Sequence, residues 1–354
     1  MAGGTWVGFW LKPRGLQANM KKFDYLEVDG DYTDLGRAIG TKFKDAIQAS
    51  VARRTKMIPN YDSYLRKTEP YFLATREAFP NLIRELEATA HAAGVGVADL
   101  FAINNREVSR SWPNQNLVSR RDNGDHCTVA VSFGDSGAVV GHNEDWDGAT
   151  PEALYFLKAK IGGTSFMGLQ YKKIIPGVAV TMNNWGLVQC INELNPTSQI
   201  GVPKNFIARA VCECKTLDEA ENLIRNTKRA SGYNHVLIQG NEVRNIETAG
   251  DKIGVEKVIG GTYVHTNHYL TPELIPLEKF HTQSSESRYE RAMKIILPGM
   301  NVAEMESLLS DKTNKEFPIS REDATLGSVV ALPKENKMYI CHGPSVKGQY
   351  EEYV

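Results

Sequence analysis

The residues best suited to chemistry gather in the stretch from Gly124 to Gly148. Two short runs rich in Val and Phe flank a Gly-Asp-Ser-Gly turn at 134–137, a pattern that predicts a tight β-hairpin. The first strand begins at the thiol of Cys127, and the second ends in the polar run His142-Asn143-Glu144-Asp145. Because antiparallel partners bring their open ends together, this hairpin would place a nucleophile beside carboxylates, an amide and an imidazole.

Cys127 itself has two interpretations. By residue type alone, a free cysteine is most commonly a small buried hydrophobic residue. Its position after Gly-Asp-His, at the start of a strand, favours a reactive thiol instead. Cys190, Cys212 and Cys341 lie inside apolar strand or helix patterns, which predicts structural roles. Cys212 and Cys214 are two apart on an expected helix, where their side chains would point to different faces, so they do not predict a metal pair.

The whole chain has the composition of an ordinary globular protein. Its 354 residues are 42% hydrophobic and 23% charged, which is enough for one large core or two modest ones. A formal net charge of -1 provides no broad attraction to nucleic acid or to an anionic membrane, so we expect a small-molecule substrate. Five scattered cysteines do not form a secreted disulfide framework. Since no apolar run approaches the roughly 18 residues of a membrane span, we expect a soluble protein. The C-terminal Glu-Glu-Tyr-Val is no recognised peroxisomal address, so a cytoplasmic location is the default expectation.

The segment before Cys127 is predicted to be mostly helical. Apolar residues recur every four positions after Thr33, and Gly-Val-Gly ends a longer helical pattern at 94–96. The expected elements are a strand at 22–28, a helix capped by Thr33, a helix at 69–93 broken or kinked near Pro80, a short helix at 97–105, and an exposed polar loop at 109–125.

The segment after Cys127 is predicted to contain most of the strands. Short apolar runs bounded by Gly or Pro indicate successive antiparallel strands, and two helical patterns follow them. We expect strands at 128–133, 138–142, 154–161, 164–170, 178–182, 187–192, 235–239, 243–248, 261–266, 328–332 and 338–341, with helices at 204–214, 217–226, 287–296 and 302–309. This order predicts an α+β layered body. No Gly-rich phosphate loop is present, so we expect no nucleotide cofactor.

Taken in order, these motifs resemble the cysteine N-terminal nucleophile (Ntn) hydrolases of the penicillin acyltransferase family, which are distantly similar to choloylglycine hydrolases. The resemblance covers the chain from about residue 25 to its C-terminal end. It implies a four-layer αββα sandwich, in which helices flank two antiparallel sheets. The motifs are Asp-His-Cys-Thr at 125–128, Asn-Glu-Asp-Trp at 143–146, Asn-Asn-Arg-Glu at 104–107, Asn-Asn-Trp-Gly-Leu at 183–187, His-Thr-Asn-His at 265–268 and Ser-Ser-Glu-Ser-Arg-Tyr at 284–289.

The resemblance implies that the chain cuts itself between His126 and Cys127. The products would be an α chain of residues 1–126 and a β chain of residues 127–354, associated as one structural domain. The cut frees an α-amine on Cys127, whose reference pKa of about 7.7 to 8 suits a general base for its own thiol. The enzyme would then cleave a small-molecule amide through a Cys127 thioester. Either water or an amine could accept the acyl group, so hydrolase and acyltransferase remain open.

The same resemblance assigns roles to four further positions. Asp145 would orient and charge the new amine, although a turn-stabilising Asp fits equally well. Asn267 would stabilise the oxyanion, its alternative being a turn residue after a strand. Asn183 would be a second donor, a role that Asn184 beside it could also take. Arg288 would lower the pKa of the thiol by its charge, the alternative being a solvated helix arginine.

Two residues depart from the family pattern. His126 stands where penicillin acyltransferases have Gly, and its Cβ restricts the strained backbone that cleavage favours, so slow processing and assistance by the imidazole are both open. His142 stands at the position of a choloylglycine-type Arg, which argues against a bile-salt substrate.

Two rival hypotheses follow from the same sequence. An unprocessed or inactive family member could serve as a binding scaffold, because a fold does not dictate a function. His265 and His268 could belong to a metal site, but residues three apart on a strand point to opposite faces, and we expect no metal.

Overall fold

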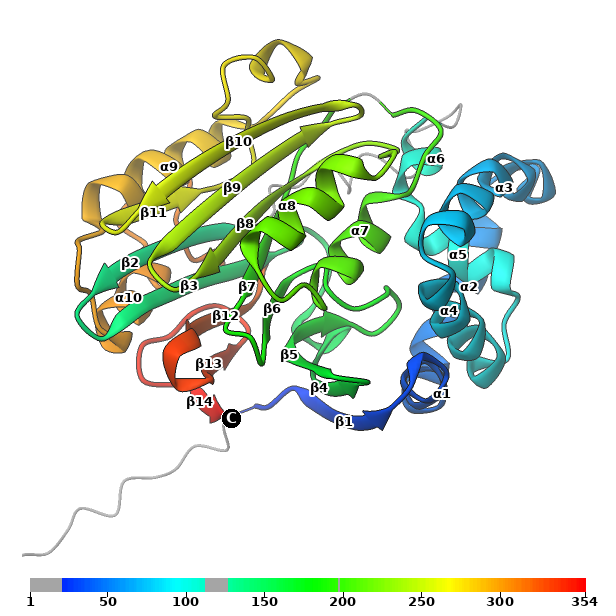
Figure 1. Ribbon diagram of the computed structural model, residues 1–354, viewed down its shortest axis with the longest axis horizontal. Coiled ribbons are helices and arrows are strands. Elements are labelled where there is room, and N and C mark those ends of the chain that lie inside the picture. The colour runs from blue at the N-terminus through cyan, green and yellow to red at the C-terminus, as the bar shows by residue number, and fades with distance from the viewer. Residues whose placement is uncertain (1–20, 112–126, 197) are drawn as a thin grey trace, which may run out of the picture.

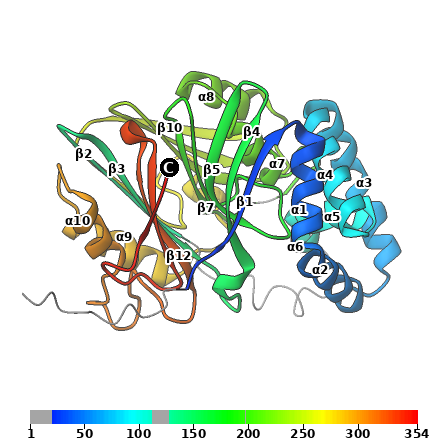
Figure 2. The same ribbon diagram turned by 90° about the horizontal axis from the view of Figure 1, so that it is seen from below.

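The computed structural model of the protein describes residues 21–111, 127–196 and 198–354. Two β-sheets face each other at its centre, and helices cover the outer face of each (Figures 1 and 2). The predicted α+β layered body is confirmed. Both sheets contribute to one continuous apolar core, so the two chain segments on either side of Cys127 form a single packed unit.

The eight-stranded sheet, called the large sheet here, runs in the order β1-β4-β5-β6-β7-β8-β9-β10. Its neighbours are antiparallel except at one edge, where β1 runs parallel to β4. The expectation of purely antiparallel pairing is wrong there, because the long connection between these two strands allows a crossover. The strands are β1 (Asp24–Gly30), β4 (Leu154–Ile161), β5 (Thr164–Tyr171), β6 (Val180–Asn183), β7 (Val188–Glu193), β8 (Tyr233–Gln239), β9 (Glu242–Ala249) and β10 (Lys252–Ile259).

The six-stranded sheet, called the small sheet, runs in the order β11-β2-β3-β12-β13-β14. Its first hairpin is the one predicted: Gly134 pairs with Gly137 at the turn, and Thr128 pairs with Asn143 at the open end. The strands are β2 (Thr128–Gly134), β3 (Gly137–Asp145), β11 (Thr262–His265), β12 (Thr325–Leu332), β13 (Lys337–His342) and β14 (Glu351–Tyr353).

Helices from the segment before Cys127 form a cluster on the outer side of the large sheet, seen in blue and cyan in Figure 2. They are α1 (Tyr32–Lys42), α2 (Lys44–Met57), α3 (Tyr61–Ala78), α4 (Pro80–Ala93), α5 (Val97–Asn104) and α6 (Arg106–Ser111). The outer layers are completed by α7 (Lys204–Val211) and α8 (Leu217–Asn226) at the large sheet, and by α9 (Gln283–Ile295) and α10 (Val302–Leu309) on the small sheet.

Several predicted helix boundaries are wrong. The helix α9 begins four residues before the expected start at 287, and α7 ends three residues before the expected end at 214. The helix expected from Thr33 is two helices meeting at Phe43, and its cap is Asp31, whose carboxylate accepts the N–H groups of Thr33 and Asp34. The Asp34 carboxylate accepts in turn from the Asp31 N–H, which completes a capping box. The N-cap therefore lies two residues before the expected cap at Thr33. The break near Pro80 is confirmed, but the helix before it begins at Tyr61.

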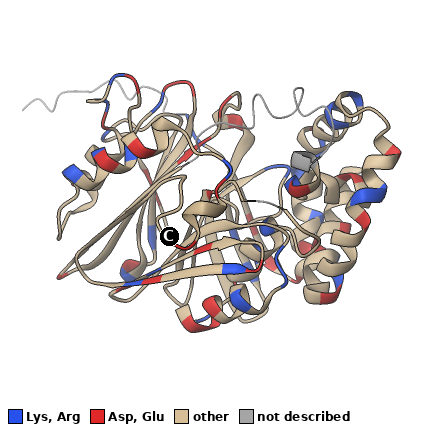
Figure 3. Ribbon diagram, turned by 90° about the horizontal axis from the view of Figure 1, so that it is seen from above, with Lys and Arg blue, Asp and Glu red and all other residues tan. Residues whose placement is uncertain are grey.

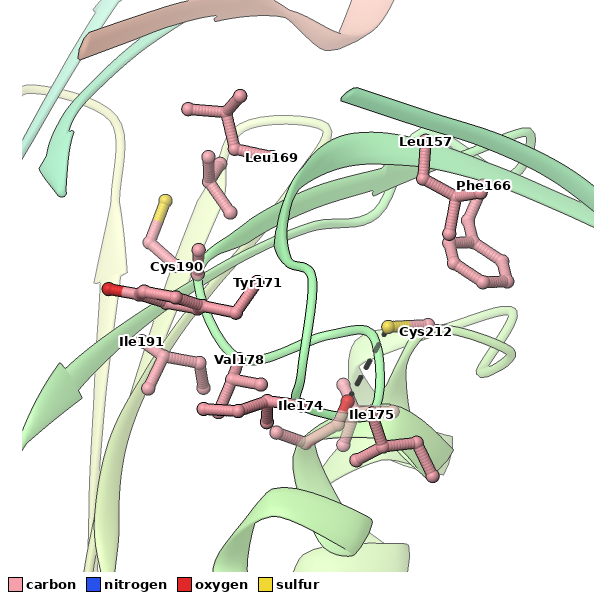
Figure 4. Packing of buried hydrophobic residues seen from close by; sticks show 14 of the residues in the cluster. Leu157, Phe166, Leu169, Tyr171, Ile174, Ile175, Val178, Cys190, Ile191 and Cys212 are labelled. Carbon is pink, nitrogen blue, oxygen red and sulfur yellow. Dashed lines mark hydrogen bonds between the residues drawn. The ribbon is translucent and has the colours of Figure 1, made fainter. Parts of the chain in front are cut away.

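Cys190 and Cys212 lie among buried apolar side chains, as the patterns around them predicted (Figure 4). Both are at most 2% exposed, and burial raises the pKa of the Cys212 thiol to about 11. A second apolar cluster lies between the small sheet and the helices α9 and α10. Helices therefore cover the outer face of each sheet, and the inner faces of the two sheets pack against each other. The result is four layers: helices, sheet, sheet and helices.

Charged residues of both signs are interspersed over the ribbon (Figure 3). Within the described residues, no single helix has the length and apolar character to cross a membrane. The bent pair α4 and α5, whose axes differ by 119°, meets that test only when the two helices are taken together.

His235 makes the stability of the fold depend on pH. Its ring is 2% exposed, its Nδ1 lies 3.1 Å from Gln189 Oε1, and burial lowers its pKa to about 3. Between pH of about 6.5 and 3 the unfolded chain binds a proton that the folded chain excludes, so this stability is lost as the pH falls. We expect a decrease in the free energy of unfolding of roughly 1.4 kcal/mol per pH unit in that window.

Urea unfolding between about pH 7 and pH 5 measures this slope. The variant His235→Asn should have a shallower slope than the wild type. The matched variant at the exposed His91, His91→Asn, should not. Equal slopes in the wild type and His235→Asn would contradict the assignment.

Candidate active site

Cys127 directly precedes β2 and is 3% exposed. Its φ angle of 73° lies in the left-handed region, which a residue with a Cβ rarely adopts. Such a conformation costs about 1–3 kcal/mol and persists only where the surroundings enforce it. Backbone strain of the kind that self-cleavage favours is therefore present at Cys127, the residue after the proposed cut. His126 lies outside the described residues.

The Cys127 thiol is held as a neutral hydrogen-bond donor. Its Sγ lies 3.4 Å from Glu144 Oε2. Burial and then the charges of Glu144 and Asp145 raise the pKa of the thiol well above its usual value, whereas a hydrogen bond with the Asp145 backbone acts in the opposite direction. The thiol is therefore protonated at neutral pH, and its reactivity depends on a nearby proton acceptor.

Arg288 connects Cys127 to Asn267. It lies on α9 and is fully buried, so the alternative of a solvated helix arginine is wrong. Its Nη1 donates to the carbonyl oxygen of Cys127 and to Thr128 Oγ1, both at 2.7 Å, and its Nη2 donates to Asn267 Oδ1 at 3.0 Å. Since these contacts with Cys127 go to the carbonyl oxygen, Arg288 fixes the backbone at the thiol. Its expected effect on the pKa of the thiol stays a prediction.

Asn267 follows β11 and is held on three sides. Its Oδ1 accepts from Arg288, its backbone N–H donates to Ser285 Oγ at 2.8 Å, and its Nδ2 donates to the carbonyl of Glu193 at 3.2 Å. Ser285 lies one turn before Arg288 on α9, so one helix positions both ends of this residue. A side-chain amide fixed in this way has the rigidity that an oxyanion donor needs.

Asp145 ends β3 and its side chain is fully buried. Its backbone hydrogen-bonds to the Cys127 thiol, and its Oδ2 lies 3.6 Å from Arg321 Nε. Because Thr128 pairs with Asn143, continuing the register brings Cys127 opposite Glu144, with Asp145 as the next residue along β3. The structure therefore brings Asp145 to the site.

Asn183 lies at the end of β6, where its side chain makes four hydrogen bonds. Its Nδ2 donates to the carbonyls of Cys212 and Cys214 at 3.2 and 2.8 Å, and its Oδ1 accepts the N–H groups of Trp185 and Leu187. These contacts stabilise the turn between β6 and β7. The neighbouring Asn184 accepts instead from the backbone N–H of residue 165 at 2.8 Å. Because these contacts engage both ends of the Asn183 amide, we assign Asn183 to the turn, and a role for either amide as an oxyanion donor stays a prediction.

The sequence interpretation missed a buried network around Glu144. This carboxylate is 3% exposed and contacts three side chains: the Cys127 thiol, His142 Nε2 at 2.9 Å and the Tyr171 hydroxyl at 2.5 Å. Strand alternation could have placed Glu144 on the same face as His142. No local signal predicts Tyr171, which reaches it from the other sheet.

The donor atoms of Cys127, His142 and Glu144 lie within 4.8 Å of one another, a set that could also hold a metal ion. Since Glu144 hydrogen-bonds to both of the other side chains, we interpret the group as a hydrogen-bond network. His265 and His268 have different partners: His265 Nε2 lies 2.8 Å from Glu247 Oε1, and His268 Nδ1 lies 2.9 Å from Ser285 Oγ. They form no shared ligand set.

Two cavities lie near the thiol and share lining residues. The inner cavity, about 20 Å³, is lined by Cys127 and Glu144, and the outer cavity is about 370 Å³. Arg106, Trp146 and Tyr171 line both cavities. The Arg106 guanidinium lies 4.7 Å from the centre of the Trp146 ring and also contacts Glu193 at 3.3 Å. The volume of the outer cavity suits a small molecule.

The chain is similar to a known protein family, to a curated relative and to a solved structure. A family model described as "Acyl-coenzyme A:6-aminopenicillanic acid acyl-transferase" matches residues 132–345. The beta-alanyl-dopamine/carcinine hydrolase of Drosophila melanogaster is 26% identical over 211 residues, which are 54% of this chain and 54% of that protein. The chain therefore matches about half the length of this curated relative.

The solved structure is that of the mutant C2A conjugated bile acid hydrolase from Clostridium perfringens. It covers 64% of this chain and 92% of that chain at 14% identity, and its TM-score of 0.45 is too low to support a conclusion. The family match covers more than half of the chain and includes β3, the Asn267 turn and α9. The chain thus belongs to the acyl-coenzyme A:6-aminopenicillanic acid acyl-transferase family, the family that its ordered motifs resemble.

Proposed function

We propose that the protein is a self-processing Ntn cysteine amidohydrolase or acyltransferase that cuts the His126–Cys127 bond and then cleaves a small-molecule amide. One observation carries this proposal: Arg288 ties the carbonyl of Cys127 and the amide of Asn267 together beside a buried, strained Cys127. Nucleophile and oxyanion donor are thereby held in one rigid frame. Family membership supports the same chemistry.

After the cut, the amine of Cys127 takes the proton from its own thiol as Sγ attacks the substrate carbonyl. Asp145 keeps the protonated amine in place by its charge, and Asn267 stabilises the oxyanion. The amine then returns the proton to the leaving group, which leaves a thioester on Cys127. Water or a second amine resolves the thioester and restores the thiol.

The substrate class is an amide of a small amine. The name of the Drosophila relative includes beta-alanyl-dopamine and carcinine, and the outer cavity, about 370 Å³, has room for molecules of that size. Four cationic side chains and one carboxylate line this outer cavity: Arg53, Arg54, Arg106, Lys173 and Asp147. A first substrate panel should therefore include aminoacyl amides with and without a free carboxylate.

N-terminal sequencing of the purified protein tests the proposal. We expect one chain to begin Cys-Thr-Val-Ala-Val, together with turnover of at least one amide in the panel. An intact chain that turns over no amide would support the rival hypothesis, an unprocessed binding scaffold.

Asn267→Ala should reduce kcat of the processed enzyme by about 10² to 10³, because loss of one oxyanion donor raises the barrier by roughly 3 to 4 kcal/mol. Asn183→Ala is the matched control. It removes an amide from the β6–β7 turn, so it should lower the melting temperature while kcat stays near that of the wild type. A large loss of kcat in Asn183→Ala, with Asn267→Ala unaffected, would reverse the two assignments.

A further inference from the structure

Glu144 is the point on which the polar groups around the thiol converge. Its Oε2 lies 3.4 Å from Cys127 Sγ and 2.9 Å from His142 Nε2, and its Oε1 lies 2.5 Å from the Tyr171 hydroxyl. A thiol, a hydroxyl and a ring N–H can all donate, whereas an ionised carboxylate can only accept. The Cys127 thiol and the Tyr171 hydroxyl both donate to Glu144, and His142 Nε2 lies within hydrogen-bond distance of the same carboxylate.

The uncut chain needs such an acceptor. Before cleavage, the nitrogen of Cys127 belongs to a peptide bond and cannot act as a base, so the amine that serves the mature enzyme does not yet exist. Burial and neighbouring negative charge raise the pKa of the thiol, which must therefore lose its proton during the attack. Arg288 contacts Cys127 at its carbonyl oxygen and has no acceptor to offer.

We propose that Glu144 is the general base, and then the general acid, of the self-cleavage step. Its Oε2 takes the Sγ proton as sulfur forms a bond to the carbonyl carbon of residue 126. The same proton passes to the nitrogen of Cys127 as the C–N bond breaks, leaving a thioester and a free α-amine. Water hydrolyses the thioester, which restores the thiol and releases a carboxylate on residue 126. This inference rests on the proposed function.

His142 and Tyr171 are positioning residues in this arrangement. His142 holds Oε2 from the same strand, and Tyr171 holds Oε1 from the large sheet, so the carboxylate is fixed across the space between the two sheets. The T-shaped contact of Tyr171 with Trp146, with 5.2 Å between ring centres, fixes the tyrosine in turn. Loss of either His142 or Tyr171 should make the Glu144 carboxylate less well positioned without removing it.

The test is the rate of self-cleavage after cell-free synthesis of the full chain. Glu144→Gln keeps the size of the side chain and removes the base, so cleavage should slow by about 10² to 10⁴. Tyr171→Phe and His142→Gln keep the carboxylate and should slow cleavage by no more than about tenfold. Glu306→Gln is the matched control: this glutamate is 8% exposed on α10, and its variant should cut at the wild-type rate.

Chemical rescue separates a base from a structural role. Added formate should speed cleavage in Glu144→Ala, because a small carboxylate can occupy the space left by the side chain, and should have no effect in Cys127→Ala. Cleavage of Glu144→Gln at the wild-type rate would overturn the role of Glu144 while leaving the proposed function intact. If Glu144→Gln does not fold, a cleavage defect in His142→Gln as complete as that of Cys127→Ala would overturn it equally. A wild-type chain that is never cut before Cys127 would instead refute the proposed function.

Discussion

Cys127→Ala should remain a single chain of 39.3 kDa and should have no amidase activity. The wild-type protein should instead give two fragments of roughly 14 and 25 kDa, from residue counts at a typical residue mass. Without the sulfur, nothing can attack the peptide bond before residue 127, and no terminal amine is released to serve as a base. Intact-mass measurement and an SDS gel check both parts of this expectation.

Cys190→Ala is the control for that experiment. Cys190 is fully buried on β7 among apolar side chains (Figure 4), so its replacement should leave the cut in place. Cys127→Ser retains a weaker nucleophile and should cut slowly. Two fragments from the Cys127→Ala protein would refute the assignment of the nucleophile.

Glu85→Ala should lower the free energy of unfolding by about 3 to 5 kcal/mol. Glu85 on α4 is 1% exposed and accepts from Arg209 on α7, whose Nη2 lies 2.8 Å from its Oε2. Removing the carboxylate leaves the fully buried Arg209 with Glu213 as its remaining acidic partner, at 2.7 Å. Denaturant unfolding of the full chain measures the loss.

A double variant distinguishes an unpaired charge from a simple cavity. Glu85→Leu combined with Arg209→Leu removes both charges and should destabilise the protein less than Glu85→Ala alone. Glu322→Ala breaks the exposed pair with Lys312 and should produce no measurable change. If Glu85→Ala had no larger effect than Glu322→Ala, the buried pair would not contribute to stability.

The sequence predicted those elements whose signals are local. The bounds of β4, α8 and α10 agree with the expected ranges, because Gly, Pro and capping residues mark their ends. Strands β10 and β14 were not predicted. Both lie at sheet edges, where polar side chains are tolerated and hide the alternation. The parallel pairing of β1 could not be predicted either, because its partner β4 lies more than a hundred residues further along the chain.

The site was predictable only in part, for a related reason. Resemblance to a family pointed to Asp145, Asn267 and Arg288. In the structure Asp145 and Arg288 contact Cys127, and Asn267 contacts Arg288, while their catalytic roles stay predictions. The contact of Tyr171 with Glu144 joins two sheets, and such contacts leave no trace in local periodicity. The turn contacts of Asn183 were not predicted either, because an Asn that closes a turn has the same local sequence as one that contacts a substrate.

The parallel pairing of β1 with β4 gives the segment before Cys127 a structural role in the large sheet. Seven residues of β1, from Asp24 to Gly30, pair with β4 along its length, although the proposed cut lies between the two strands in the chain. A polypeptide beginning at Cys127 would expose β4 as an open edge, which invites aggregation with other chains. The segment before Cys127 therefore stabilises the large sheet, and we expect it to stay bound after the proposed cut. Heterologous production should then require both parts of the chain to fold together.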